Sequence, residues 1–188
     1  RLTRKIGIEN IRFAVVGQGH IGKRHAEMIR RNEWAELVAV CDVLPQEEVG
    51  LSDLEVPYFR SIEELLSAGL GLDVVNICTP NYFHAEYALL CLNHNLHVVL
   101  EKPIALRRSD AEQIVFKSLQ VSKHVFCVMQ NRYSPPSVWL KQVIDEKLLG
   151  DIYMVQLNCF WYRVARYYKP GNWYGDGKLD GGTLFTQF

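Results

Sequence analysis

The chain has 188 residues, of which 48% are hydrophobic and 22% charged, and its 21 basic residues balance its 21 acidic ones. This composition is too apolar for a disordered chain, and the length suffices for one domain and part of a second. A net charge of zero without long runs of like charge argues against a nucleic-acid or membrane-surface partner. A small-molecule ligand is therefore expected.

The cysteines and histidines indicate neither a disulfide framework nor a metal site. The five cysteines are scattered, odd in number and never arranged as Cys-x-x-Cys. The histidines that we read as structural lack acidic or cysteine neighbours at metal-ligand spacing; they are His25, His94, His97 and His124. We therefore expect no metal. No apolar run approaches the ~20 residues of a membrane span, so we expect a cytoplasmic protein.

A glycine-rich turn follows the first apolar run, residues 13–16, and an amphipathic segment comes behind it. In a strand–turn–helix unit, Gly17 permits the tight turn, Gly19 lets the backbone approach a pyrophosphate, and Gly22 lets the helix pack closely. The first amides of the helix then face the phosphates. Because such glycine patterns recur in unrelated loops, the strand before the turn is needed to predict a dinucleotide site. The expected contacts are Gly17, Gln18, Gly19, His20, Ile21 and Gly22.

A second apolar run, residues 37–41, ends in Asp42, twenty residues after Gly22. An acid at the tip of the second strand accepts hydrogen bonds from the adenosine ribose and repels a 2′-phosphate. Asp42 therefore favours NAD over NADP. The alternative is a solvated aspartate that opens a turn before Pro45.

Strands and helices are expected to alternate as far as residue 129. After the first strand, apolar runs predict strands over residues 36–41, 58–60, 72–79, 97–100 and 124–129. Helices are predicted over residues 61–69, 82–93 and 109–121, with Ser61 and Ser109 as N-caps. Six strands separated by helices predict an α/β fold: a doubly wound, parallel Rossmann domain over residues 1–130.

Polar residues gather where the expected strands end, and a ligand crevice lies at that edge of a doubly wound sheet. Thr79 and Asn81 are expected to contact the cofactor, although an ordinary turn around Pro80 is the alternative. Glu101 is expected to bind the nicotinamide ribose or to orient Lys102, with a surface acid as the alternative. After the last strand, Gln130 and Arg132 are further cofactor candidates.

The pattern changes after residue 130, where we expect a second domain over residues 131–188. A helix is predicted over residues 135–147, and the alternation of apolar and polar residues over 152–162 predicts an antiparallel strand. An aromatic, basic and glycine-rich loop follows over residues 163–179. One strand cannot cover its own face, so only the beginning of an α+β open-sheet domain is expected here.

Several motifs together resemble one family, the Gfo/Idh/MocA oxidoreductases. In chain order they are Gly-x-Gly-x-x-Gly, Cys41-Asp42-Val43, Thr79-Pro80-Asn81-x-x-His84, Glu101-Lys102-Pro103, Gln130-Asn131-Arg132 and Asp180-Gly181-Gly182. The segments over 166–173 and 181–188 resemble a narrower group, the UDP-N-acetyl-2-amino-2-deoxyglucuronate dehydrogenases of bacterial O-antigen synthesis. That resemblance implies oxidation of a nucleotide sugar at C3 with NAD, and a homodimer or homotetramer assembled through an open sheet.

The resemblance makes Lys102 the expected catalytic residue and a contact of both the cofactor and the substrate. A partly desolvated lysine beside a cationic nicotinamide has a lowered pKa, so it can accept a proton near neutral pH; a surface lysine before a turn proline is the alternative. His84 resembles the family's histidine near the cofactor, although a packed helix histidine is the stronger reading.

Five further residues are expected at the substrate, with a surface role as the alternative for the arginines and a core role as the alternative for the tryptophan. Arg163 and Arg166 suit a diphosphate or carboxylate, and Trp173 suits stacking on a sugar or the cofactor. Thr186 or Gln187 stands where many family members have an aspartate, which leaves Lys102 as the only acid–base candidate. Two other functions stay open: oxidation of an inositol or aldose, and a non-catalytic NAD-binding regulator.

Overall fold

The computed structural model describes residues 9–51, 55–168 and 172–182. Its core is one parallel sheet of six strands in the order β3-β2-β1-β4-β5-β6, which confirms the doubly wound α/β fold. The strands are β1 (Ile11–Val16), β2 (Ala35–Cys41), β3 (Tyr58–Phe59), β4 (Val74–Ile77), β5 (His97–Glu101) and β6 (Val125–Val128). The chain order reverses between β1 and β4, so the crevice of such a fold is expected between their carboxyl ends.

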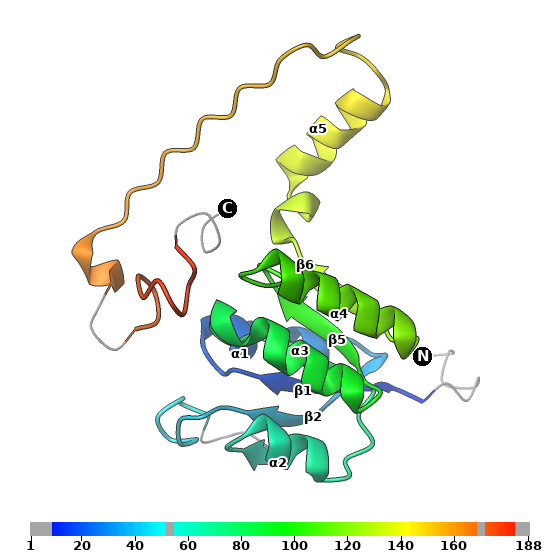
Figure 1. The fold of residues 1–188 in the computed structure, drawn as a ribbon, viewed down its shortest axis with the longest axis vertical. Coiled ribbons are helices and arrows are strands. Elements are labelled where there is room, and N and C mark those ends of the chain that lie inside the picture. The colour runs from blue at the N-terminus through cyan, green and yellow to red at the C-terminus, as the bar shows by residue number, and fades with distance from the viewer. Residues whose placement is uncertain (1–8, 52–54, 169–171, 183–188) are drawn as a thin grey trace.

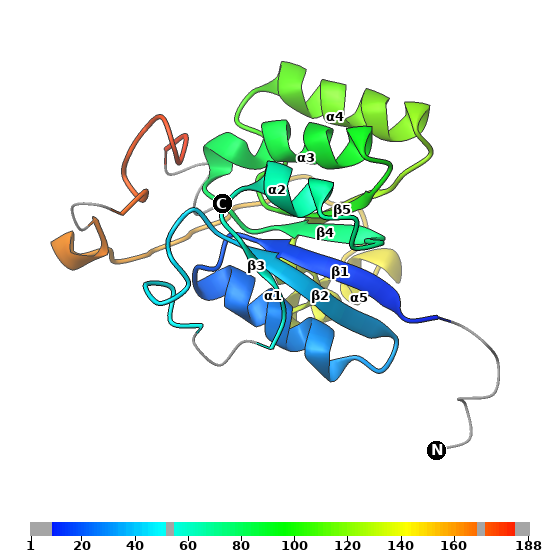
Figure 2. The ribbon, with the colours of Figure 1, turned by 90° about the horizontal axis from the view of Figure 1, so that it is seen from below.

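Helices cover both faces of the sheet (Figure 2). One face carries α1 (His20–Arg31), whose Ala26 and Ile29 pack against buried strand residues such as Val15 and Val40. The other carries α2 (Ile62–Ser67), α3 (His84–Asn93) and α4 (Arg108–Gln120), which bury the larger apolar cluster. The strand interiors are buried on both sides, as their near-continuous apolar runs predict.

Two helix starts differ in detail from expectation. Ser61 does cap α2, because its side chain accepts a hydrogen bond from Glu64 N at 3.1 Å. Ser109, in contrast, is not an N-cap: α4 begins at Arg108, which places Ser109 inside the first turn, where its hydroxyl donates to Asp110 Oδ1 instead. The expected helix after β4 begins as a 3-10 turn, η1 (Asn81–Phe83).

The predicted strand over residues 152–162 is wrong for the described chain. These residues run without secondary structure from the end of α5 (Pro135–Asp145) back to η3 (Ala165–Tyr168), passing beside the sheet domain (Figure 1). Their alternating side chains are exposed, with Tyr153, Leu157 and Phe160 at 92%, 86% and 91%. The pattern suits a strand, but a strand needs a neighbour, and no described segment pairs with this one. The expectation of a second domain from residue 131 stays a prediction.

Among the described residues, no helix is long and apolar enough to cross a membrane.

Candidate active site

The glycine turn between β1 and α1 has the geometry that its sequence predicts. Gly17 has a φ of +89°, and a Cβ there would lie 2.6 Å from the Cys78 carbonyl oxygen. A Cβ on Gly22 would lie 1.7 Å from the Gly17 carbonyl oxygen, so the helix packs directly on the turn. Gly19 is different, because a Cβ there would meet nothing within 4 Å. Gly17 and Gly22 are required by the fold, whereas Gly19 leaves space at the helix N-terminus for a ligand.

Asp42 lies beside this turn, at the tip of β2. Its Oδ2 accepts a hydrogen bond from Gln18 N at 2.6 Å, and its Oδ1 accepts one from Leu44 N at 2.9 Å. The carboxylate thus joins the glycine turn, and it also closes the local turn that was the alternative for this residue. The turn reading is thus observed, and a contact between Asp42 and the ribose of a cofactor stays a prediction.

A crevice of about 420 Å³ opens at the carboxyl ends of the strands. A volume in this range suits part of a small-molecule ligand. The described residues that line it are Gly19, His20, Ile21, Cys78, Thr79, Asn81, His84, Glu101, Lys102, Gln130, Asn131, Trp161, Arg163, Tyr167, Trp173 and Tyr174. Lys102 is therefore at the same opening as the glycine turn, as the sequence predicts.

The Lys102 amine is half-buried, and burial lowers its pKa. The neighbouring Glu101 carboxylate acts in the opposite direction, because its negative charge favours the ammonium form. The peptide bond between Lys102 and Pro103 is cis. Within the described residues, burial and the Glu101 carboxylate thus act on the pKa of this amine in opposite directions, and burial has the larger effect.

Glu101 is held by a histidine that the sequence left as structural. His25 Nε2 lies 3.0 Å from Glu101 Oε1, and His25 Nδ1 lies 2.9 Å from Asn76 Nδ2. The three residues come from α1, β5 and β4. No spacing in the sequence predicts this contact, because His25 and Glu101 are 76 positions apart.

His84 is fully buried beneath the crevice. Its Nδ1 lies 2.6 Å from the Pro103 carbonyl oxygen and its Nε2 lies 3.0 Å from the Thr79 carbonyl oxygen. Burial lowers the pKa of the imidazole, although the two carbonyl groups act to raise it. His84 thus fastens the tips of β4 and β5 together, in agreement with the packed reading. Direct contact with a cofactor stays a prediction.

Thr79 and Asn81 have different surroundings at the tip of β4. Thr79 Oγ1 is buried and has no hydrogen-bond partner among the described residues, which fits a hydroxyl that serves a ligand. Asn81 Nδ2 instead donates to the Asp180 carbonyl oxygen at 2.8 Å. The Asn81 side chain therefore fastens the C-terminal loop to the cofactor side of the crevice.

Aromatic and basic residues of the C-terminal segment form one wall of the crevice. The Arg163 guanidinium lies 4.7 Å from the Trp161 ring centre and 4.8 Å from that of Tyr167. Tyr174 contacts both Tyr167 and Trp173. Cation–π contacts and ring stacking give this wall its shape. Of its members, the sequence singled out Arg163 and Trp173.

The remaining candidates lie elsewhere. Gln18 is buried and its side-chain amide donates to the Val15 carbonyl, so it shapes the turn. Arg132 and Arg166 are exposed and are not among the residues that line the crevice. Thr186 and Gln187 fall outside the described residues.

Comparison with known proteins decides the family. Residues 11–128 match the Gfo/Idh/MocA model, described as an oxidoreductase family with an NAD-binding Rossmann fold. The chain belongs to the Gfo/Idh/MocA oxidoreductases. The family resemblance and NAD as cofactor are thereby confirmed.

Individual Gfo/Idh/MocA relatives include sugar and polyol dehydrogenases. The WlbA dehydrogenase from Chromobacterium violaceum, solved with NADH and UDP-GlcNAcA, is 34% identical with a TM-score of 0.89 over 97% of this chain and 53% of that one. The inositol 2-dehydrogenase of Rhizobium meliloti is 31% identical over 78% of this chain and 44% of its own. The D-glucoside 3-dehydrogenase of Escherichia coli is 29% identical over 77% and 42%. The chain thus spans about half the length of these relatives.

The crevice of this Gfo/Idh/MocA member fits a pyridine dinucleotide on its own features. Gly19 leaves room at the N-terminus of α1, where a diphosphate is favoured. Thr79 supplies a buried hydroxyl without another described partner, and Asp42 adds an acid beside the turn. These groups suit the phosphates and hydroxyl groups of a dinucleotide.

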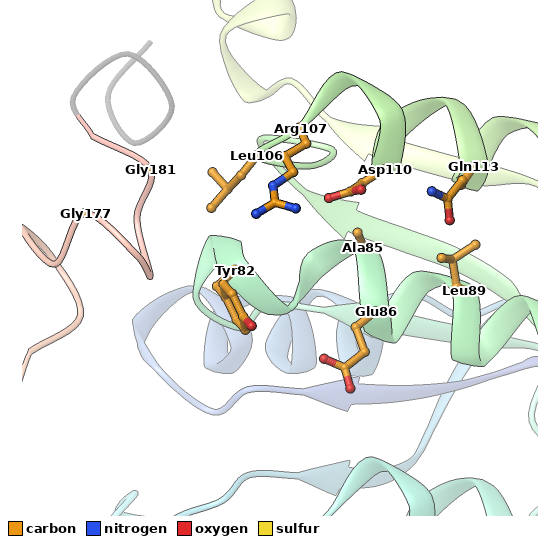
Figure 3. A pocket seen from close by; sticks show the side chains of 10 residues that line it. All are labelled: Tyr82, Ala85, Glu86, Leu89, Leu106, Arg107, Asp110, Gln113, Gly177 and Gly181. Carbon is orange, nitrogen blue, oxygen red and sulfur yellow. The ribbon is translucent and has the colours of Figure 1, made fainter.

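A second cavity, of about 520 Å³, lies on the side of α3 that faces α4 (Figure 3). Figure 3 shows Tyr82 of η1, Leu106 and Arg107 before α4, and Gly177 and Gly181 of the C-terminal loop facing them. Because Lys102 and the glycine turn are not among its lining residues, this cavity is separate from the crevice.

Proposed function

We propose that the protein is an NAD-dependent dehydrogenase that oxidises a secondary hydroxyl of a sugar, and that its substrate is a UDP-N-acetylhexosaminuronate oxidised at C3. One observation carries the reaction: a half-buried lysine whose pKa is lowered lines the same crevice as the glycine turn of an NAD-binding fold. By the sequence resemblance, oxidation of such a nucleotide sugar belongs to the synthesis of bacterial cell-surface polysaccharides.

The chemistry divides between the cofactor and this chain. The nicotinamide, when bound, accepts a hydride from the carbinol carbon. Lys102 accepts the hydroxyl proton at Nζ, which requires the neutral amine that its lowered pKa favours. The negative charge of Glu101 favours the resulting ammonium, and a hydrogen bond from that ammonium stabilises negative charge developing on the substrate oxygen. The products are a ketone, NADH and protonated Lys102.

The aromatic wall supports a nucleotide sugar as substrate. A uracil ring can stack on Trp173 or Tyr174, and the Arg163 guanidinium offers two parallel N–H groups to a phosphate or carboxylate. A free polyol has neither an aromatic base nor a charge for these groups to recognise. The WlbA dehydrogenase structure with UDP-GlcNAcA favours the same substrate class.

The test is to incubate the full chain with NAD and UDP-GlcNAcA and to follow NADH at 340 nm and a 3-keto product by mass spectrometry. Removing the base in Lys102→Ala should lower kcat by about 10²–10⁴-fold with NAD affinity nearly unchanged. Lys117→Ala on α4 is the matched control and should retain full activity.

The other outcomes separate the alternatives. Turnover of inositol or glucose without turnover of UDP-GlcNAcA would contradict the substrate and keep the dehydrogenase. NAD binding without turnover of any of these compounds would favour the non-catalytic regulator.

A further inference from the structure

We propose that His25 is a positioning residue: from the second turn of α1 it fixes the Glu101 carboxylate, and through it the Lys102 amine, by donating from Nε2. The inference deepens the proposed function and rests on the role given there to Lys102. It is carried by the contact between His25 Nε2 and Glu101 Oε1 at 3.0 Å.

The proton on His25 is assigned by its second neighbour. Asn76 Nδ2 can only donate, so at 2.9 Å it requires His25 Nδ1 to accept. The proton of a neutral imidazole then resides on Nε2, which faces the carboxylate. Asn76 thus sets the tautomer, and the tautomer makes His25 a donor to Glu101.

The contact is sheltered enough to hold a geometry. The side chains of His25 and Glu101 are only 16% and 15% exposed, and Asn76 is buried within β4. Solvent screens the electrostatic attraction in a hydrogen bond between such mostly buried groups less than in a surface pair. Because α1 also carries the glycine turn, His25 links the cofactor helix to the tip of β5.

This link matters to Lys102 because Glu101 is the one carboxylate that acts on the pKa of that amine in the described residues. Glu101 also acts to raise the pKa of the Cys78 and Cys127 thiols and of the His84 imidazole. One carboxylate oxygen is occupied by His25, so the second is left for the nicotinamide ribose or the lysine. Losing His25 would let the carboxylate rotate and would misplace the base.

Two amide variants of His25 test whether it positions Glu101 by a hydrogen bond or only fills space. His25→Gln can place its amide donor near the former Nε2, whereas His25→Asn is too short to reach Glu101. In the full chain we expect His25→Asn to lower kcat by about ten- to hundredfold, the loss of a hydrogen bond to a charged group. NAD affinity, measured by NADH fluorescence, should change less than about threefold, and His25→Gln should recover most of the lost kcat.

A second readout needs no substrate. Ring ¹⁵N shifts of labelled histidine, read with and without NADH, should show His25 as the neutral Nε2–H tautomer. An Nδ1–H tautomer or an imidazolium at pH 8 would overturn the proposal, as would equal loss of kcat in the Gln and Asn variants. If no substrate is turned over, the proposed function fails, and the ¹⁵N spectra still decide whether His25 donates to Glu101.

Discussion

The sheet domain and the C-terminal segment are held in place in different ways. Within the sheet, each strand from β1 to β6 is hydrogen-bonded to its neighbours and packed between helices. The described segment after α5 is mostly exposed and is joined to the sheet domain by bonds such as Asn81 Nδ2 to Asp180 O and Tyr82 N to Leu179 O. Lys102 is therefore positioned by the core of the fold, and the aromatic wall by a loop attached at η1.

This difference explains which parts of the crevice tolerate change. The carboxyl ends of β4 and β5 carry Thr79, Glu101 and Lys102. The register of these two strands is fixed because they are buried on both faces. Trp173 and Tyr174 depend on the fold of their own loop. A change in the first set should damage folding or chemistry, whereas a change in the second should damage recognition of the substrate.

The largest expected effect is in the glycine turn. Gly22→Ala places a Cβ 1.7 Å from a backbone oxygen that cannot move away easily, so we expect a loss of at least about 3 kcal/mol of unfolding free energy together with NAD binding. Urea unfolding and NADH fluorescence measure the two losses. Gly19→Ala is the control: its Cβ meets open space, so the fold should survive while NAD affinity falls. Equal stability of the two variants would contradict the assigned packing.

Asp180 is the corresponding position in the C-terminal segment. Its Oδ2 accepts from Gly175 N at 2.6 Å and its Oδ1 from Gly182 N at 2.7 Å. Asp180→Ala leaves both amides without this acceptor, so the loop that carries Trp173 should lose its shape and KM for UDP-GlcNAcA should rise about tenfold. NAD affinity should stay within about twofold.

Asp176→Ala is the matched control, because its side chain is exposed and accepts a local bond from Lys178 N. An equal loss of NAD affinity in Asp180→Ala would contradict the division between the two regions.

The sequence predicts the sheet domain well because its rules are local. Apolar runs locate the strands, the glycine spacing locates the turn, and polar strand ends locate Asp42, Thr79 and Lys102. It does not predict contacts between distant elements, such as His25 with Glu101, or that Asn81 binds the C-terminal loop. The strand expected over 152–162 is wrong because alternation shows which side chains share a face, and pairing depends on a neighbouring strand.

Glu101 offers a smaller test within the sheet domain. Its charge raises the pKa of Lys102 against the effect of burial, so Glu101→Gln should lower that pKa further. The neutral amine is the active form, hence activity rises as pH rises through this pKa. The acid limb of the kcat profile should therefore move to lower pH. Glu112→Gln on exposed α4 should leave the limb in place, and an unmoved limb in Glu101→Gln would mean that another group titrates.

The smallest expected effect distinguishes two serines at helix starts of the sheet domain. Ser61→Ala removes the oxygen that accepts from Glu64 N, which should cost about 1 kcal/mol of unfolding free energy. Ser109 does not cap α4, so Ser109→Ala should cost less than about 0.5 kcal/mol. Urea unfolding of both variants beside wild type measures the difference. Equal costs would mean that Ser109 does stabilise the start of α4, and that the sheet domain depends on such local bonds more than its packed core indicates.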